Sequence, residues 1–169
     1  MSDQHVEIVK LDNIIASFWN DLFKSSQSEY VKKAIDKKDV RLYCIYLIQL
    51  YHWSSWAARC LGLAGANPYN RNDSLMTHYF DHAKEETGHE KMALNDLQNI
   101  GITINDPKKD LPKPLPTTEA LVAYVKYLAG CDQPYKMLGY DYWSEKPYKY
   151  INHFIYSIKD AMNLKNDQM

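Results

Sequence analysis

The sequence lacks the features that mark several large classes of protein. Its 169 residues carry 20 basic and 21 acidic side chains, so a net charge of −1 gives no preference for nucleic acid or an anionic membrane. No apolar run approaches the ~18 residues of a membrane span, and the first residues lack a secretion signal. A glycine-rich phosphate loop, a nucleophile elbow and a CxxC motif are all missing. We therefore expect a cytoplasmic protein whose partner is a small molecule.

Cysteine is also scarce. Cys44, Cys60 and Cys131 are widely spaced, odd in number and located in or near apolar runs. This pattern predicts buried thiols in a reducing compartment rather than a disulfide framework.

What the sequence does contain is helical periodicity, while strand alternation is hard to find. The length suits one domain with a substantial core, so we expect residues 1–169 to form a single all-α domain. A capping box of Ser26 and Glu29 predicts the start of the second helix. The proline-rich stretch 105–116 is expected to be a non-helical connector. The predicted helices span residues 6–24, 26–37, 39–63, 74–100, 117–129 and 134–162, the last with a kink at Pro147.

Three polar side chains interrupt the apolar stripe of the predicted helix 74–100. His82, Glu86 and His89 follow one another at intervals of four and three residues, so they share a helix face. Burying such groups without partners would cost about 2 to 7 kcal/mol each. The three side chains therefore need a partner that offsets this cost of burial, and a metal ion is one candidate. The apolar residues that continue this stripe on both sides are Leu75, Tyr79, Ala93, Leu97 and Ile100.

Glu86 and His89 form the strongest pair for metal chemistry. A carboxylate and an imidazole three residues apart on one helix are the half-site from which helical bundles build iron or manganese centres. The alternatives are a hydrogen-bonded polar cluster and a solvated helix face. A second source of ligands is needed, and Glu145 is the best candidate because Leu138, Tyr142 and Glu145 share a face. A glutamate turned to solvent near Pro147 is the alternative there.

His52 lies on the most hydrophobic predicted helix. We interpret it as a hydrogen-bonded core histidine, and the alternative is a pocket-lining role together with Gln49. His153 and Asp160 could both face inward on the last helix, or both could be exposed.

The segment 81–90 resembles the haem-oxygenase-like superfamily, and specifically its non-haem iron branch of oxidases and oxygenases. Its sequence is DHAKEETGHE, followed by LNDL at 94–97 and Ile100-Gly101. The resemblance extends to residues 134–145, which look like the glutamate-bearing helix of that family. The order of the predicted helices agrees as well, so the resemblance covers most of the chain.

The resemblance implies a multi-helix bundle that holds one or two non-haem irons, or manganese, and activates O2 to oxidise or cleave a small organic substrate. Carried over, Glu86 and His89 would be ligands from one helix, Glu145 a ligand from another, and His82 a supporting ligand. Haem is not expected, because the first helix offers only His5. The helix that usually supplies the family's remaining ligands does not appear before Met169.

The missing helix leaves alternatives open. Either the chain is truncated, or a second subunit completes the bundle, or the metal site is incomplete and the domain has another function. An apolar face left uncovered would be buried in a homodimer. A second hypothesis is a non-catalytic relative that binds a small ligand or a partner helix. A third is a cofactor-free hydrolase of the thiaminase-like branch, with Cys131 or Cys60 as its nucleophile.

Overall fold

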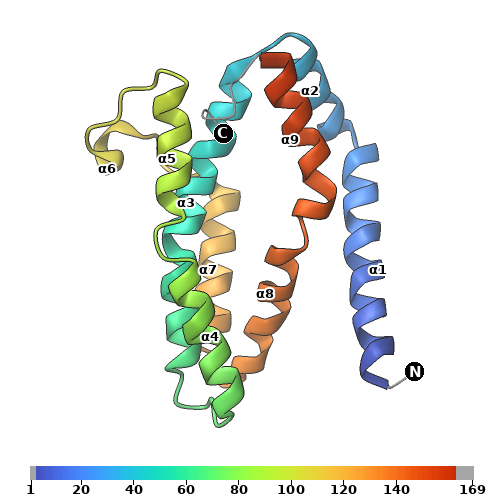
Figure 1. Cartoon of the computed structure of the whole chain (residues 1–169), viewed down its shortest axis with the longest axis vertical. Helices are drawn as coiled ribbons and strands as arrows, with labels where there is room; N and C mark the ends of the chain where they lie inside the picture. Colours follow the sequence, from blue (N-terminus) through green and yellow to red (C-terminus); the bar gives the residue numbers. More distant parts are fainter. Residues whose placement is uncertain (1–2, 163–169) are drawn as a thin grey trace. The chain divides into compact units, whose positions relative to one another are not determined.

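The computed structural model describes residues 3–162, with side-chain detail for all of these except residues 3–5, 148, 153, 154, 159, 161 and 162. Every regular element in this range is a helix, which confirms the all-α prediction (Figure 1). None of the helices in 3–162 has the length and apolar character needed to cross a membrane. The elements are α1 (Asp3–Lys24), α2 (Ser26–Asp36), α3 (Val40–Gly65), α4 (Asp73–Glu85), α5 (Glu90–Asn99), α6 (Pro107–Asp110), α7 (Pro116–Gly130), the 3-10 turn η1 (Pro134–Lys136), α8 (Met137–Glu145) and α9 (Tyr148–Met162).

The described residues divide into two compact units. The first comprises residues 3–42 and 142–162, and the second comprises residues 43–141. Helix α8 begins in the second unit and ends in the first.

In the second unit the chain descends along α3, returns through α4 and α5, and descends again along α7 (Figure 1). Two side chains, one in the first half of α3 and one just after its end, hold the two ends of α7, which runs parallel to α3. Gln49 Oε1 accepts hydrogen bonds from the Leu115 amide and the Thr118 hydroxyl, each at 2.8 Å. At the other end, Asn67 Nδ2 donates to the carbonyls of Ala129 and Cys131 at 2.9 and 2.8 Å.

The core of the second unit lies where α3, α4, α7 and the start of α8 meet. Tyr79, Ala129 and Met137 are 0% exposed there. Of the predicted apolar stripe, Tyr79, Ala93 and Leu97 are buried, whereas Leu75 and Ile100 are half-buried. Burial of this apolar surface is the main favourable term in folding. The cluster consists of Cys60, Leu61, Ala64, Tyr79, Val125, Leu128, Ala129 and Met137.

The proline-rich connector contains one helical turn, contrary to the prediction that it is wholly non-helical. Asp106 caps α6 by accepting a hydrogen bond from the Lys108 amide, and Pro107 occupies the first position, where its missing N–H is not needed. The rest of the connector is extended. His52 Nε2 lies 2.8 Å from the Pro112 carbonyl oxygen, so this histidine is hydrogen-bonded as predicted, but it is half-buried against the connector rather than in the core.

The predicted single helix 74–100 is wrong, because the chain breaks between α4 and α5. Gly88 has a φ of +96°, a left-handed conformation that only glycine adopts without strain and that a continuous right-handed helix cannot contain. Thr87 adds a hydroxyl bond to the Ala83 carbonyl at 2.8 Å. Glu86 is therefore the C-cap residue that follows α4 and His89 the N-cap residue that precedes α5, rather than both lying mid-helix.

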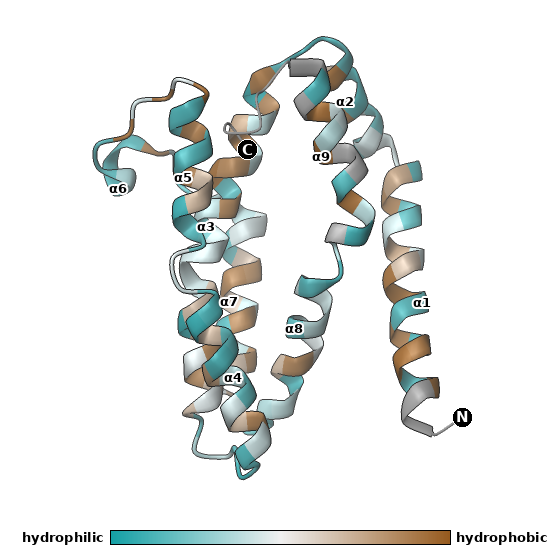
Figure 2. Cartoon of the chain, in the orientation of Figure 1, coloured by the Kyte–Doolittle hydropathy of each residue, from teal (hydrophilic) through white to brown (hydrophobic). Residues whose placement is uncertain are grey.

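In the first unit, α1 and α2 follow the predicted ranges closely. The cap of α2 differs from the prediction, since the Ser25 hydroxyl, not that of Ser26, accepts from the Ser28 amide. The Asp12 carboxylate accepts a hydrogen bond from the Tyr142 hydroxyl at 2.8 Å and pairs with Lys146 at 3.2 Å. These two partners lower the pKa of Asp12, with the Tyr142 hydrogen bond as the larger cause. Apolar residues recur along α1 (Figure 2), and Ile14 is 65% exposed.

Candidate metal site

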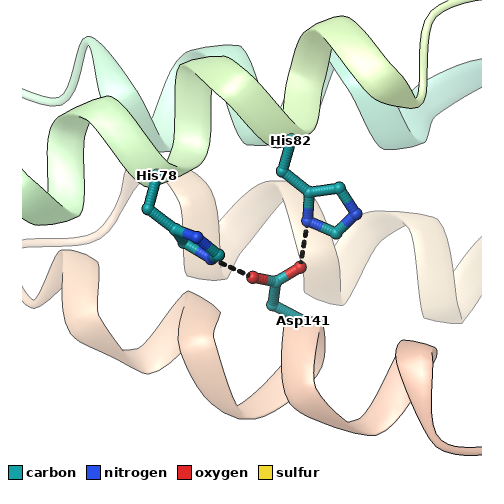
Figure 3. A group of neighbouring side chains, drawn as sticks. All are labelled: His78, His82 and Asp141. Atoms are coloured by element: carbon teal, nitrogen blue, oxygen red, sulfur yellow. Dashed lines mark hydrogen bonds and ion pairs between the residues drawn. The ribbon is translucent and has the colours of Figure 1, made fainter.

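Helix α4 presents two imidazoles to one carboxylate. His78 and His82 lie four residues apart and so share a face of the helix. Asp141 lies four residues after Met137, the first residue of α8. His82 Nδ1 is 2.6 Å from Asp141 Oδ1, and His78 Nε2 is 2.7 Å from Oδ2 of the same carboxylate (Figure 3). Each carboxylate oxygen thus faces one imidazole nitrogen.

Two tyrosines fix the helices that carry these groups. Tyr79, the neighbour of His78, is fully buried and donates its hydroxyl to the Pro134 carbonyl at 2.8 Å, just before α8. Tyr140, the neighbour of Asp141, accepts a hydrogen bond from Trp53 Nε1 at 2.7 Å. These bonds tie α4 to the start of α8, and α8 to α3. They therefore fix the register of α8 against α4 that brings Asp141 into contact with His78 and His82.

The electrostatic surroundings of the cluster favour neutral phenols. Burial, and then the negative charge of Asp141, raises the pKa of Tyr79 to about 12. Burial is also the largest cause that raises the pKa of Tyr140 above its usual value, and its hydrogen bond from Trp53 acts in the opposite direction. Both hydroxyls are therefore protonated at neutral pH.

A second group of polar side chains continues from His82 to the break between α4 and α5. Glu86 Oε1 lies 3.6 Å from His82 Nε2, and Glu86 Oε2 lies 3.1 Å from His89 Nδ1. Exposure rises along this direction, because the side chain of His82 is 13% exposed, that of Glu86 19% and that of His89 47%. The side chains thus form one polar chain from His78 through Asp141, His82 and Glu86 to His89.

The donor set suits a transition metal. One ligand atom from each of His78, His82 and Asp141 can be chosen so that all three lie within 4.8 Å of one another. Imidazole nitrogens with a carboxylate oxygen suit iron, manganese or zinc, whereas magnesium and calcium prefer oxygen ligands alone.

The structure gathers part of the predicted ligand set. His82, Glu86 and His89 lie together in the polar chain, and the role of each as a ligand stays a prediction. Glu145 ends α8 and belongs to the first unit, so its part as the opposite ligand also stays a prediction. The side chains of His5 and His153 fall outside the described ones.

Sequence reasoning missed His78 and Asp141. His78 lies one helical turn before His82, and continuing the histidine spacing backwards would have found it. Asp141 was overlooked because the face of α8 was read through Tyr142, whereas Leu138, Asp141 and Glu145 are spaced equally well for one face.

The described cysteines carry free thiols, and Cys60 is buried as predicted, whereas Cys44 and Cys131 are half-buried. Burial raises the pKa of Cys44 and of Cys60, so little reactive thiolate is present at neutral pH. Cys131 Sγ donates to the Leu128 carbonyl at 3.3 Å. These surroundings give no support to the thiaminase-like hypothesis.

Comparison with solved structures identifies the fold. The chain superposes with a TM-score of 0.87 on the crystal structure of a domain of unknown function with a haem-oxygenase-like fold from Shewanella denitrificans OS217. The two share 32% sequence identity over 96% of this chain and 68% of that chain. The chain belongs to the haem-oxygenase-like family. Protein-family models and curated proteins gave no match. Membership in the haem-oxygenase-like family confirms the predicted fold.

Proposed function

We propose that the protein is a non-haem oxidoreductase that binds iron, or alternatively manganese, and activates O2 to oxidise or cleave a small organic substrate. The observation that supports this proposal is the cluster of His78, His82 and Asp141 on α4 and α8. Two histidines and one carboxylate, with further coordination positions open, are the donor set of non-haem iron(II) oxygenases.

The protein's own residues hold and orient the donors. Asp141 faces Nδ1 of His82, which leaves Nε2 of the same ring directed towards Glu86. His82 would bind a metal held by the cluster through Nδ1, beside Asp141, and Glu86 would face the other ring nitrogen. A carboxylate on the non-ligating nitrogen fixes the tautomer of a metal-binding histidine and raises its basicity. Glu86 and His89 continue the polar chain from His82, and their role as further ligands rests on that proximity. Iron, when bound, supplies the one-electron chemistry that O2 requires.

A second candidate function is metal-independent binding of a small ligand or a partner helix. The observation that favours it is the closeness of the His–Asp contacts, at 2.6 and 2.7 Å. His78 Nε2 forms a hydrogen bond with Asp141 Oδ2, and His82 Nδ1 lies at ion-pair distance from Oδ1, so the imidazoles and the carboxylate compensate one another without an ion.

Metal analysis separates the two candidates. The purified protein is reconstituted anaerobically with Fe(II) or Mn(II), passed through a desalting column and assayed for bound metal. We expect stoichiometric metal in the native protein and none in the double variant His78→Ala/His82→Ala. His52→Gln is the control, since His52 contacts the connector and not the cluster. Equal, trace amounts of metal in all three proteins would favour the second candidate.

The proposal includes a homodimer. Several apolar side chains of α1 are exposed, among them Val9, Leu11, Ile14 and Phe18. Burying them between two copies would remove this apolar surface from water. Multi-angle light scattering at micromolar concentration should give twice the mass of the chain, and a monomer would contradict the expectation.

A further inference from the structure

A groove lies on another face of α4 from the His–Asp cluster. It has a volume of about 390 Å³, near the lower end of the roughly 300 to 1,000 Å³ of small-molecule sites. Ala83 and Lys84 contribute from α4, on a face that the helical turn directs away from His78 and His82. The full lining is Ser54, Ser55, Ala58, Arg59, Ala83, Lys84, Thr87, Gly88 and Glu90.

The break between α4 and α5 shapes one wall of the groove. Gly88 has no side chain. Among residues 3–162, a Cβ atom placed there would have one neighbouring heavy atom within 4 Å, which is Lys91 Cδ at 4.0 Å. The left-handed turn thus leaves open space between Thr87 and Glu90.

The charged groups of the groove carry both signs. Arg59 and Lys84 contribute two positive charges, and Glu90 contributes one negative charge. Across residues 3–162 none of these three forms an ion pair with another side chain. Arg59 lies 6.0 Å from the centre of the Trp56 ring, a contact that leaves its N–H groups available to a carboxylate.

The hydroxyls of the groove offer lone pairs rather than protons. Ser54 and Ser55 donate their hydroxyl protons to carbonyls of α3 at 2.7 and 2.6 Å, and Thr87 donates its own to the Ala83 carbonyl of α4 at 2.8 Å. A carbonyl oxygen can only accept, so each hydroxyl oxygen remains an acceptor for a ligand. The hydroxyls and Glu90 would repel a plain anion, and Arg59 and Lys84 would repel a plain cation.

We infer that this groove binds a small zwitterion of the amino-acid type. The carboxylate of such a ligand pairs with Arg59 and Lys84. Its ammonium group donates to Glu90 and to the hydroxyl oxygens. The small side chains of Ala58 and Ala83 leave room for an aliphatic ligand side chain. The site is independent of the proposed metal.

The test compares three probes that share one carbon skeleton. L-leucine carries both charges, 4-methylpentanoate only the carboxylate and 3-methylbutylamine only the ammonium. Each is titrated into the full-length protein in a chelator, and amide chemical shifts are followed by NMR. We expect L-leucine to shift the amides of residues 54–59 and 83–90 with a dissociation constant of about 1 mM, and each single-charge analogue to bind about tenfold more weakly or worse.

Matched variants assign the charges. Arg59→Met should weaken L-leucine binding about tenfold while improving the weak binding of 3-methylbutylamine, and Glu90→Gln should weaken L-leucine binding while improving 4-methylpentanoate. Arg71→Met and Glu85→Gln, exposed residues outside the groove, are the controls. No shift with L-leucine, or equal affinity for L-leucine and 4-methylpentanoate, would overturn the inference. His82→Ala should bind L-leucine normally, so failure of the metal proposal and failure of this one are distinguishable.

Discussion

The two ends of the polar chain that runs from His78 to His89 are built differently. At one end Asp141 is 7% exposed and meets two imidazoles within 2.7 Å, on helices that Tyr79 and Tyr140 fix in register. At the other end Glu86 and His89 lie 3.1 Å apart at a break in the helix, and His89 is 47% exposed.

The difference separates a preorganised arrangement from an adjustable one. Donor atoms held by buried helices need little reorganisation when they bind an ion, whereas a turn can move its side chains at small cost. We therefore expect the Asp141 end to contribute most to metal affinity, and the His89 end to contribute geometry that adapts to the metal or the substrate.

His82→Ala should have the largest effect, because His82 belongs to both ends. We expect Fe(II) affinity to fall by more than about 100-fold, since the loss of a residue outside the ligand set alone costs about 10- to 100-fold. Competition titration with a chromophoric chelator measures it. Asp81→Ala, an exposed neighbour, is the control. Unchanged Fe(II) affinity in His82→Ala would show that the polar chain is not the metal site.

Asp141→Asn should weaken both the metal site and the fold. The amide keeps one oxygen acceptor but faces one imidazole with an N–H₂ group, so we expect metal affinity to fall about 10- to 100-fold. The free energy of unfolding without metal should fall by about 1 to 3 kcal/mol, because a buried partner is lost. Metal titration and urea denaturation test these two effects. Asp132→Asn at an exposed position should change neither quantity.

His78→Ala and His89→Ala compare the two ends directly. We expect His78→Ala to reduce metal affinity at least about tenfold more than His89→Ala, since His78 contacts the buried carboxylate. The same chelator titration provides the measurement. A larger loss in His89→Ala would place the metal at the Glu86 end and reverse our comparison.

Gly88→Ala tests the adjustable end through the backbone. A side chain at a φ of +96° is strained, so the free energy of unfolding should fall by about 1 to 2 kcal/mol. Gly101→Ala has a matching φ of +101° and lies past the end of α5, so it should lose similar stability. Thermal unfolding measures both. Metal affinity should change in Gly88→Ala alone, and an equal change in both variants would contradict a local role for the break.

Tyr79→Phe should give the smallest effect, seen at high pH. The folded protein keeps the Tyr79 proton up to a pKa of about 12, whereas an unfolded tyrosine loses it near 10, so the folded state binds more protons between these values. The stability that Tyr79 contributes is complete below pH 10 and is lost as pH rises from 10 to 12. Urea midpoints should fall less steeply over this range in Tyr79→Phe. Tyr69→Phe, at an exposed tyrosine, should follow the native protein.

The helical fold could be predicted from the sequence because apolar spacing repeats through most of the chain. The break at Gly88 could not, since an isolated glycine is tolerated within many helices and its φ depends on tertiary packing. The one-turn helix α6 was missed for a related reason, because Pro107 was read as a helix breaker when it stands where proline suits a helix start.

The candidate site was half predictable. His82, Glu86 and His89 share one short segment, so their spacing places them together. Asp141 is 59 positions beyond His82 along the numbering, and its pairing depends on how α8 packs against α4 through Tyr79 and Tyr140. Spacing within one helix carries no information about that register.

The bonds from Gln49 and Asn67 to the two ends of α7 bear on how the chain folds. Each bond joins groups that are 62 to 69 residues apart in the sequence. Pairing of α3 with α7 therefore closes a loop of chain that contains α4, α5 and the proline-rich connector. Closing so long a loop costs entropy that local helix formation does not repay. The transition state for folding should therefore contain α4 and α5 largely formed, with the α3–α7 bonds made late. Substitutions at Gln49 and Asn67 are then expected to speed unfolding more than they slow folding.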